Sequence, residues 1–355
     1  NSSGLIKDIH DSRIDLINQD INNNELFRYK LYFCVKKELD YKENSIKRLF
    51  NNDKKMDYEI EKQLQESLEK LRKTENDIVS KLERAGFNNV IIPKEDETVD
   101  FIYNQINWKE RNFEGFKTSD DFLGTDVEIN KEYIYMNNKY GKFITFKAGR
   151  EPDISFPTII NYLTSAGNNF EYDIVINFKK LNKKKEKDKL QSKEDFIQIA
   201  KWRPWSNKVD KDKQKAENDV SSLLQELTDN NENLFEVEFL ILVKADNLNK
   251  LKENTTEIIS SITEMNGAVG FEESFSNFNL YTSTLPGNSE LDNYRNFKCK
   301  TTYLSDLLPI YGPPPAFKKE EKPAILFRNR FKGITSFDLL NKHSNSNNAL
   351  VVGGT

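Results

Sequence analysis

Strand-like segments alternate with amphipathic helical segments over most of this chain, and this alternation restricts the possible folds more than any other feature of the sequence. Residues 172–178 (YDIVINF) and 234–243 (LFEVEFLILV) are rich in β-branched and aromatic side chains, which favour β-strands. Helical patterns over 216–227 and 247–265 follow these two strands in turn. We therefore predict an α+β fold, in which α/β-type mixed sheets carry packed helices on at least one face.

The amino-terminal third of the chain shows weaker patterns of the same types. Residues 26–35 (LFRYKLYFCV) alternate partly with a period of two, which predicts a strand with one buried face. An apolar stripe predicts a helix over 57–84. Residues 133–136 and 142–147 predict the two strands of a hairpin, joined through the turn-rich residues 137–141.

Glycine and proline mark the turns of the second half of the chain. Gly267 and Gly270 predict a turn after the helix over 247–265, and the residues near 278–282 predict a further strand. The sequence Thr284-Leu-Pro-Gly287 predicts a type II turn, because proline fixes one φ angle and glycine supplies the positive φ that follows it.

The overall charge is balanced, with 53 basic and 57 acidic side chains and a formal net charge of -4, so it predicts no general affinity for nucleic acid or anionic membranes. No run of eighteen apolar residues is present, and we expect a cytoplasmic protein without a membrane-spanning helix. Cys34 and Cys299 are far apart and predict reduced, partly buried thiols. With only two histidines in addition, the sequence offers no zinc site.

The most highly charged region is 179–215, which begins with KKLNKKKEKDK and surrounds an aromatic insert. A lysine run of this kind predicts a solvated loop or helix face, and contact with phosphate or lipid is the alternative. Trp202, Arg203 and Trp205 form the insert. They predict either a cap on the core or an anchor for a partner, because tryptophan and arginine are enriched at the energetic centres of interfaces.

The length of 355 residues and a run of three prolines after Tyr311 predict more than one folding unit. The predicted units are an amino-terminal α/β docking region over 1–302, which divides further into 1–160 and 161–302, a Pro-rich linker over 303–320, and the start of a second domain over 321–355.

Two strands are predicted in that second domain, over 324–330 and 334–340, and a third over 349–352 runs directly into Gly353-Gly354-Thr355. A buried strand followed by glycines is how a phosphate-binding loop begins, because unhindered backbone amides cradle the phosphate oxygens. These three residues fill the first positions of the pattern G-x-x-x-x-G-K-[ST]. On its own, the segment is better explained as a plain strand followed by a glycine turn.

Several short motifs in order extend this signal. They are the turn Leu285-Pro286-Gly287, the strand pair around Phe327 and Phe337, and the segment from Asn348 to Gly353. This order resembles the amino-terminal half of the conjugation and type IV secretion ATPases, the TraC, TrbE and CagE relatives. The resemblance runs from Tyr172 onward, is looser before it, and does not extend to the lysine-rich residues 179–215.

The resemblance implies the start of a RecA-like P-loop NTPase domain, cut inside its Walker A motif. Gly353, Gly354 and Thr355 are then a partial site for ATP, which the full-length protein binds with Mg²⁺ and hydrolyses as a hexamer. The 355 residues themselves are expected to bind no cofactor and to hold no catalytic residue.

The role implied for these residues is docking to inner-membrane components of a secretion machine and to neighbouring subunits. The machine transfers DNA or protein and is attached at the cytoplasmic face of the inner or plasma membrane. We expect the contacts to be made by Trp202, Arg203, Trp205 and the helix over 217–227. Two alternatives stay open: a stand-alone cytosolic adaptor, and a nucleic-acid-binding module that stacks bases on the two tryptophans.

Overall fold

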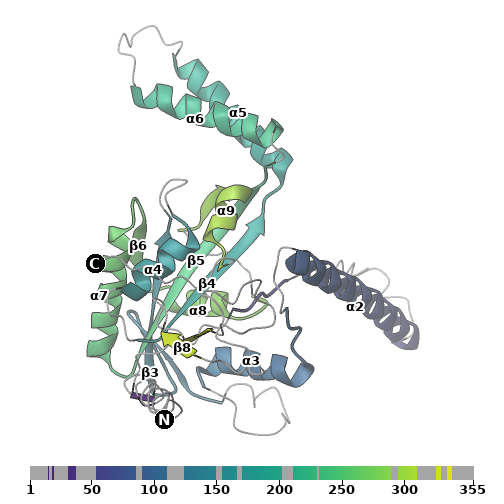
Figure 1. Ribbon diagram of the computed structural model, residues 1–355. Helices are drawn as coiled ribbons and strands as arrows, with labels where there is room; N and C mark the ends of the chain where they lie inside the picture. Colours follow the sequence, from purple (N-terminus) through teal and green to yellow (C-terminus); the bar gives the residue numbers. More distant parts are fainter. Residues whose placement is uncertain are drawn as a thin grey trace, which may run out of the picture. The chain divides into compact units, whose positions relative to one another are not determined.

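The computed structural model (Figure 1) describes residues 15, 18, 19, 31–36, 53–84, 90–109, 124–148, 154–165, 170–201, 211–229, 232–288, 295–309, 325–328 and 334–337. These residues fall into two compact units. The smaller unit spans 33–124 and 285–288, and the larger unit holds the rest of the chain.

The larger unit is built on a seven-stranded antiparallel sheet. Its strands are β1 (Val127–Ile129), β2 (Ile134–Met136), β3 (Lys139–Lys147), β4 (Tyr172–Lys180), β5 (Leu234–Ala245), β6 (Val269–Glu272) and β7 (Phe297–Lys300). The α+β prediction is confirmed. The expectation of α/β-type mixed sheets is wrong for the described strands, because each pair of them runs antiparallel.

Strand β5 is the centre of the sheet. On one side it pairs with β4 over the whole length of β4, from Tyr172 opposite Val243 to Lys180 opposite Phe235. On the other side β3 pairs with the second half of β5, and β7 pairs with the first half. Strand β3 lies before residue 160 and β5 lies after it, so the predicted division at residue 160 does not separate two folded units.

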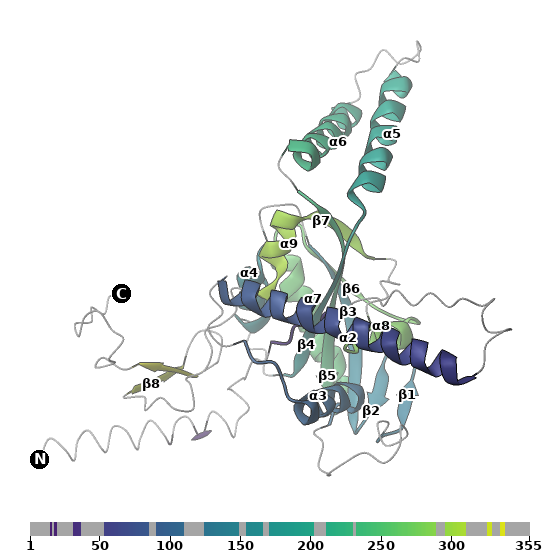
Figure 2. The same cartoon turned by 90° about the vertical axis from the view of Figure 1, so that its right-hand side faces the viewer.

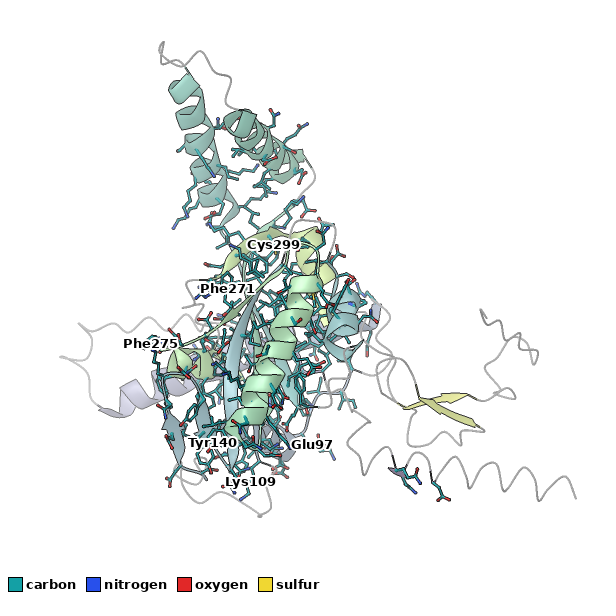
Figure 3. All side chains as sticks on the ribbon, turned by 90° about the vertical axis from the view of Figure 1, so that its left-hand side faces the viewer. Glu97, Lys109, Tyr140, Phe271, Phe275 and Cys299 are labelled. Atoms are coloured by element: carbon teal, nitrogen blue, oxygen red, sulfur yellow. The ribbon has the colours of Figure 1, made fainter. Side chains whose placement is uncertain are left out.

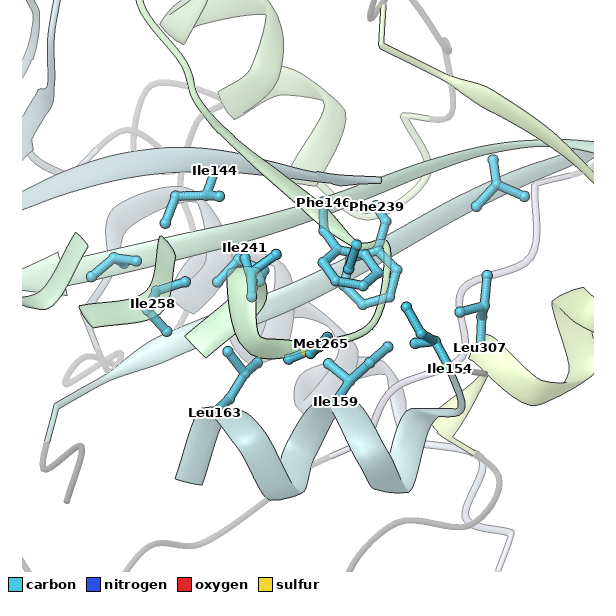
Figure 4. Close-up of a cluster of buried hydrophobic side chains, with 14 of the residues drawn as sticks. Ile144, Phe146, Ile154, Ile159, Leu163, Phe239, Ile241, Ile258, Met265 and Leu307 are labelled. Atoms are coloured by element: carbon cyan, nitrogen blue, oxygen red, sulfur yellow. The ribbon is translucent and has the colours of Figure 1, made fainter. Parts of the chain in front are cut away.

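Three helices cover one face of this sheet: α4 (Phe156–Ser165), α7 (Leu248–Glu264) and α9 (Thr301–Leu307). Alternate residues of β5 point toward them, because side chains of a strand alternate between its two faces. Phe239 and Ile241 are fully buried there, and the Phe239 ring lies 4.7 Å from that of Phe146 on β3. Figure 4 shows these side chains meeting those of α4 and α7, which form the main apolar core.

Helix α8 (Asn277–Thr284) lies on the opposite side of the sheet from α7 (Figure 1). The prediction of a strand near 278–282 is therefore wrong. Asn277, Leu280 and Tyr281 are buried, and their spacing of three and four residues is that of one helix face. The side-chain amide of Asn177 on β4 joins α8 to the sheet by donating to the Ser283 carbonyl at 2.8 Å.

Two helices are inserted between the neighbouring strands β4 and β5. Helix α5 (Lys183–Lys201) continues from β4, and α6 (Lys211–Asp229) returns to β5. Figures 1 and 2 both show the pair projecting beyond the end of the sheet, next to β7 and α9. The predictions of a helix over 216–227 and of strands over 172–178 and 234–243 are confirmed. We call α5 and α6 the helical hairpin.

The turns of the larger unit follow the backbone preferences of their residues, with two differences from the prediction. The predicted β2–β3 hairpin is present, but its turn is only Asn137-Asn138, with φ of 50° and 60°, a type I′ geometry that asparagine tolerates. The turn at Gly267 is present, with φ of 73°. Gly270 instead lies within β6, where an added Cβ would come within 3.0 Å of the Ile262 side chain.

The smaller unit contains helices α2 (Asp53–Arg84) and α3 (Glu95–Asn107). The helix predicted over 57–84 is confirmed as a segment of α2. The carboxylate of Glu97 accepts a hydrogen bond from the Lys94 backbone at 2.8 Å, which caps the start of α3. The turn at Leu285–Asn288 is also confirmed, since Asn288 N–H donates to the Leu285 carbonyl at 3.1 Å and Gly287 has a φ of 83°.

Residues 31–36, the described portion of the strand predicted over 26–35, are not in a strand. Their apolar side chains are exposed, Val35 most of all at 58%, and so is the thiol-bearing Cys34. The prediction of a buried strand face is therefore wrong for these residues, because no described strand pairs with them.

The carboxyl-terminal elements are α9 and a separate ribbon of β8 (Ile325–Arg328) and β9 (Ile334–Phe337), which pair antiparallel. The two strands predicted over 324–330 and 334–340 are confirmed within these bounds. Tyr303, Leu304 and Leu307 of α9 are buried in the main core. The first residues of the range 303–320 therefore belong to the folded unit and not to a linker. The strand predicted over 349–352 lies outside the described residues.

We expect Phe239→Ala to lower the free energy of unfolding by about 3–5 kcal/mol, because the substitution leaves a cavity against Phe146 in a fully buried site. Ile241→Val on the same strand face is the matched control and should cost about 0.5–1.5 kcal/mol. Urea unfolding followed by circular dichroism measures both. Equal, small losses would contradict the packing of the helices on this face.

Candidate docking site at the base of the helical hairpin

The residues predicted to make partner contacts lie in the connection of the helical hairpin. Helix α5 ends at Lys201 and α6 begins at Lys211, so Trp202, Arg203 and Trp205 belong to the segment that joins them. These three residues lie outside the described residues, as do Gly353, Gly354 and Thr355. The roles of these six residues therefore stay predictions. The structure describes α5 and α6, the two helices on either side of the tryptophan insert.

The lysine-rich sequence forms the first half of α5. Asn182 caps the helix, since its side-chain oxygen accepts from the Lys185 backbone at 3.1 Å. Of the lysines that follow, Lys184, Lys185, Lys189 and Lys193 are exposed. The prediction of a solvated loop or helix face is confirmed for these side chains as a helix face.

One buried carboxylate connects α5 to the sheet. Glu186 accepts from Lys189 Nζ at 2.7 Å and from Lys298 Nζ on β7 at 2.6 Å, and its side chain is 9% exposed. The hydrogen bond from Lys189, and after it the bond from Lys298, lowers the pKa of Glu186 below its ordinary value. The carboxylate thus stays charged and holds two ammonium groups from separate elements close together.

A second ion pair joins α6 to β7. Lys300 Nζ lies 2.8 Å from Glu226 Oε2, and both side chains are about a quarter to a third exposed. The two ion pairs attach both helices of the hairpin to the same short strand. Cys299, between the two β7 lysines, is buried, and Figure 3 labels it where the hairpin meets the sheet.

These elements enclose a pocket of about 430 Å³, which we call the base pocket. Its lining residues are Glu186, Lys189, Leu190, Lys193, Leu223, Leu234, Lys298, Cys299, Lys300 and Tyr303. Four lysines and one carboxylate give the lining a formal charge of +3, or +2 when the nearby Glu226 is counted. The base pocket is therefore cationic, although the whole chain is acidic.

A hollow of about 450 Å³ lies between the two helices themselves, further from the sheet. Lys187 donates to the Thr228 hydroxyl across it at 3.0 Å, and the Ser221 hydroxyl donates to Glu194. Acidic and basic groups are mixed in this lining. These contacts hold the two helices together and leave no excess of positive charge.

Lys244 and Glu273 are two other buried charges of the larger unit, and both are paired. Burial alone would lower the pKa of Lys244, but Asp173 at 2.6 Å and Glu171 at 3.3 Å outweigh it and raise that pKa. Glu273 accepts from Thr145 at 2.6 Å and from Arg295 at 2.7 Å. Within the described ranges, no three histidine, cysteine or acidic residues are grouped to hold a metal ion. These pairs are most simply explained as structural contacts of the sheet.

The sequence patterns do not connect Lys298 and Lys300 with the lysines of α5. The passage YRNFKCKTTY over 294–303 is visibly basic, but only the pairing of β7 with β5 brings it to the hairpin. The sequence alone gives no sign of this pairing.

Comparison with protein families shows what the chain belongs to. Residues 94–293 match the profile of the CagE, TrbE, VirB family, described as a component of the type IV transporter system. The match covers more than half of the chain, which therefore belongs to this family. Comparison with curated proteins gives no match.

The family match agrees with the expected resemblance and differs from it in extent. It begins at residue 94, well before Tyr172, and it includes the turn Leu285-Pro286-Gly287 and the whole helical hairpin. The strands around Phe327 and Phe337 lie beyond it. The chain is a component of a type IV transporter system, and among the described residues no helix is long and apolar enough to cross a membrane.

We expect Glu186→Gln to destabilise the protein by about 1–3 kcal/mol near neutral pH, because Lys189 and Lys298 lose their shared carboxylate. The lowered pKa means that this stabilisation is present above the ordinary carboxylate range and is lost as the pH falls through the folded-state value. The difference between the two proteins should therefore shrink below about pH 4. Thermal unfolding across a pH series measures it.

The exposed Glu253 on α7 provides the control, since Glu253→Gln removes the same charge from a surface position. A Glu186→Gln effect that is no larger than the control effect, or that does not change with pH, would contradict the ion-pair network.

Proposed function

We propose that this chain is the docking region of a type IV secretion or conjugation ATPase, and that the helical hairpin makes its main contacts with the membrane-embedded machine. The full-length protein energises assembly of the machine or transfer of DNA or protein through it. The observation that carries the proposal is the family match over 94–293, which contains the sheet core and the whole hairpin.

The architecture supports a contact role for the hairpin. Leu181 N–H donates to the Leu234 carbonyl at 2.9 Å, so the chain leaves and re-enters the sheet at adjacent points. The 52 residues between these two are not needed to pair β4 with β5. The sequence that joins the two helices contains Trp-Arg-Pro-Trp, and aromatic and cationic side chains are enriched at interface centres.

The catalytic element of the proposal rests on the sequence around Gly353, Gly354 and Thr355. As the beginning of a Walker A loop they would bind the phosphates of ATP, with Mg²⁺ neutralising charge during phosphoryl transfer. We further propose that the motor acts as a hexamer at the cytoplasmic face of the inner or plasma membrane. The described residues serve docking and subunit contacts in this scheme.

The gene provides a direct test of the nucleotide site. Roughly the next ten codons after Thr355 should include those for a glycine, a lysine and a serine or threonine, which complete the loop. A polypeptide of the 355 residues should show no hydrolysis of Mg-ATP above background, and a longer polypeptide that includes the lysine should show it. A reading frame that continues without this lysine would remove the ATPase assignment and leave the family membership intact.

We expect the double variant Trp202→Ala/Trp205→Ala to weaken recruitment to the transporter by about thirtyfold or more, because truncation of an interface tryptophan costs about 2 kcal/mol or above. Co-purification with the membrane components measures recruitment. Phe275→Ala/Phe278→Ala removes two exposed aromatics elsewhere and is the matched control. If the tryptophan variant instead fails to fold by circular dichroism, the residues cap a core and the docking role is refuted.

The nucleic-acid-binding alternative predicts a different result with the same proteins. It requires salt-dependent binding of single-stranded DNA that the double tryptophan variant loses, because bases would stack on the indole rings. Unimpaired recruitment together with this loss would favour that alternative.

A further inference from the structure

The base pocket combines cationic and apolar side chains in one lining. Its rim carries lysines from two separate elements, Lys189 and Lys193 on α5 and Lys298 and Lys300 on β7. Its other lining residues include leucines of both helices and of β5. A ligand that satisfies this surface has an anionic group for the rim and an apolar portion for the floor.

The positive charge of the rim is only partly neutralised within the protein. Glu186 binds Lys189 and Lys298 together, and Glu226 binds Lys300. These two carboxylates bind Lys189, Lys298 and Lys300, and no ion pair of Lys193 is found among the described residues. Because Glu186 fixes two of the lysines, the pocket is preorganised for an anion and loses little side-chain entropy on binding.

The positive surface continues outside the pocket. Lys179 and Lys180 at the end of β4 and Lys184 and Lys185 at the start of α5 are all exposed. Four to eight clustered basic side chains attract anionic membranes with about 1 kcal/mol per side chain near the surface, which is about fivefold in partitioning. These lysines add positive charge near the base of the hairpin, where Glu236 lies opposite Lys179 in the strand pairing.

We propose that the base pocket binds the headgroup of an anionic phospholipid, and that the surrounding lysines lie against the lipid surface. The phosphate contacts Lys189 and Lys193 on one side and Lys300 on the other. The first carbons of the acyl chains contact Leu190 and Leu223. The inference rests on the proposed docking role and names a partner for it: the lipid that surrounds the transporter.

The dimensions and chemistry of the pocket favour a lipid over other anions. A volume of about 430 Å³ is that of a site for one small ligand, and a bound peptide helix needs a longer groove. Inorganic phosphate would leave the leucines uncovered. Single-stranded nucleic acid binds by stacking its bases on aromatic side chains, and Tyr303, the aromatic residue of the lining, is only 5% exposed.

Vesicle flotation with the purified 355-residue chain tests the proposal. The protein should float with phosphatidylcholine vesicles that contain about one third phosphatidylglycerol and should not float with phosphatidylcholine alone. Lys189→Gln/Lys193→Gln should lower the partitioning by about twenty-fivefold, since two lysines at about fivefold each are removed. Lys298 remains to neutralise Glu186 in this variant, so the fold is retained, and circular dichroism checks this.

Two matched variants locate the site. Lys250→Gln/Lys252→Gln on α7 removes the same charge from exposed positions and should change partitioning by less than about twofold. Lys184→Gln/Lys185→Gln removes exposed lysines of α5 that do not line the pocket, and it should cost less than the pocket variant. If Lys184→Gln/Lys185→Gln lowered the partitioning as much as Lys189→Gln/Lys193→Gln does, the pocket would be ruled out as the binding site.

Three other outcomes would also overturn the proposal. They are flotation that does not depend on anionic lipid, displacement of the protein from vesicles by inorganic phosphate at constant ionic strength, and binding to single-stranded DNA that the pocket variant abolishes. The assay contains only protein and lipid. Its failure therefore leaves the docking role to be judged by recruitment to the transporter components, which is a separate measurement.

Discussion

The antiparallel pairing of β4 with β5 is the interaction on which the larger unit depends. It extends over nine residues of β4 and leaves the other side of β5 to be shared by β3 and β7. Because β5 continues past the end of β3, β7 can pair beside the root of the helical hairpin. The lysines of β7 face those of α5 because β5 is longer than β3, so the first half of β5 is left to pair with β7.

The two faces of the sheet are stabilised in different ways. The face under α4, α7 and α9 is almost entirely apolar, and Phe239 and Ile241 are fully buried there. The other face carries buried polar side chains such as Glu238, which accepts from Asn177 at 2.8 Å. Buried charges are tolerated where a partner is within hydrogen-bonding distance, and at the hairpin base the same rule fixes cationic side chains around an open pocket.

Local sequence patterns are sufficient for the elements whose structure is decided locally. They predict the strands β4 and β5, the helix α7 and the Pro-Gly turn at Leu285–Asn288. They fail for the residues near 278–282, because a short apolar pattern fits both a strand and a helix, and packing on the sheet favours the helix α8. The antiparallel pairing of the sheet also depends on tertiary structure, and alternation of strands and helices does not determine it.

The candidate site is predictable only in part. The lysine run and the Trp202–Trp205 insert are visible in the sequence, as is the start of a phosphate-binding loop. The base pocket is not, since Lys298 and Glu186 meet across 112 residues of chain. No local pattern encodes such a contact, whereas the family match identifies the chain without reference to it.

The helical hairpin starts and ends at adjacent points of the sheet, so its length is independent of the strand pairing. Since Leu181 and Leu234 are hydrogen-bonded at its root, lengthening, shortening or replacing the hairpin changes neither the register of β4 and β5 nor the apolar core. The entropy of closing an inserted segment increases only slowly with its length. A hairpin of a different length or surface could therefore be carried on the same sheet.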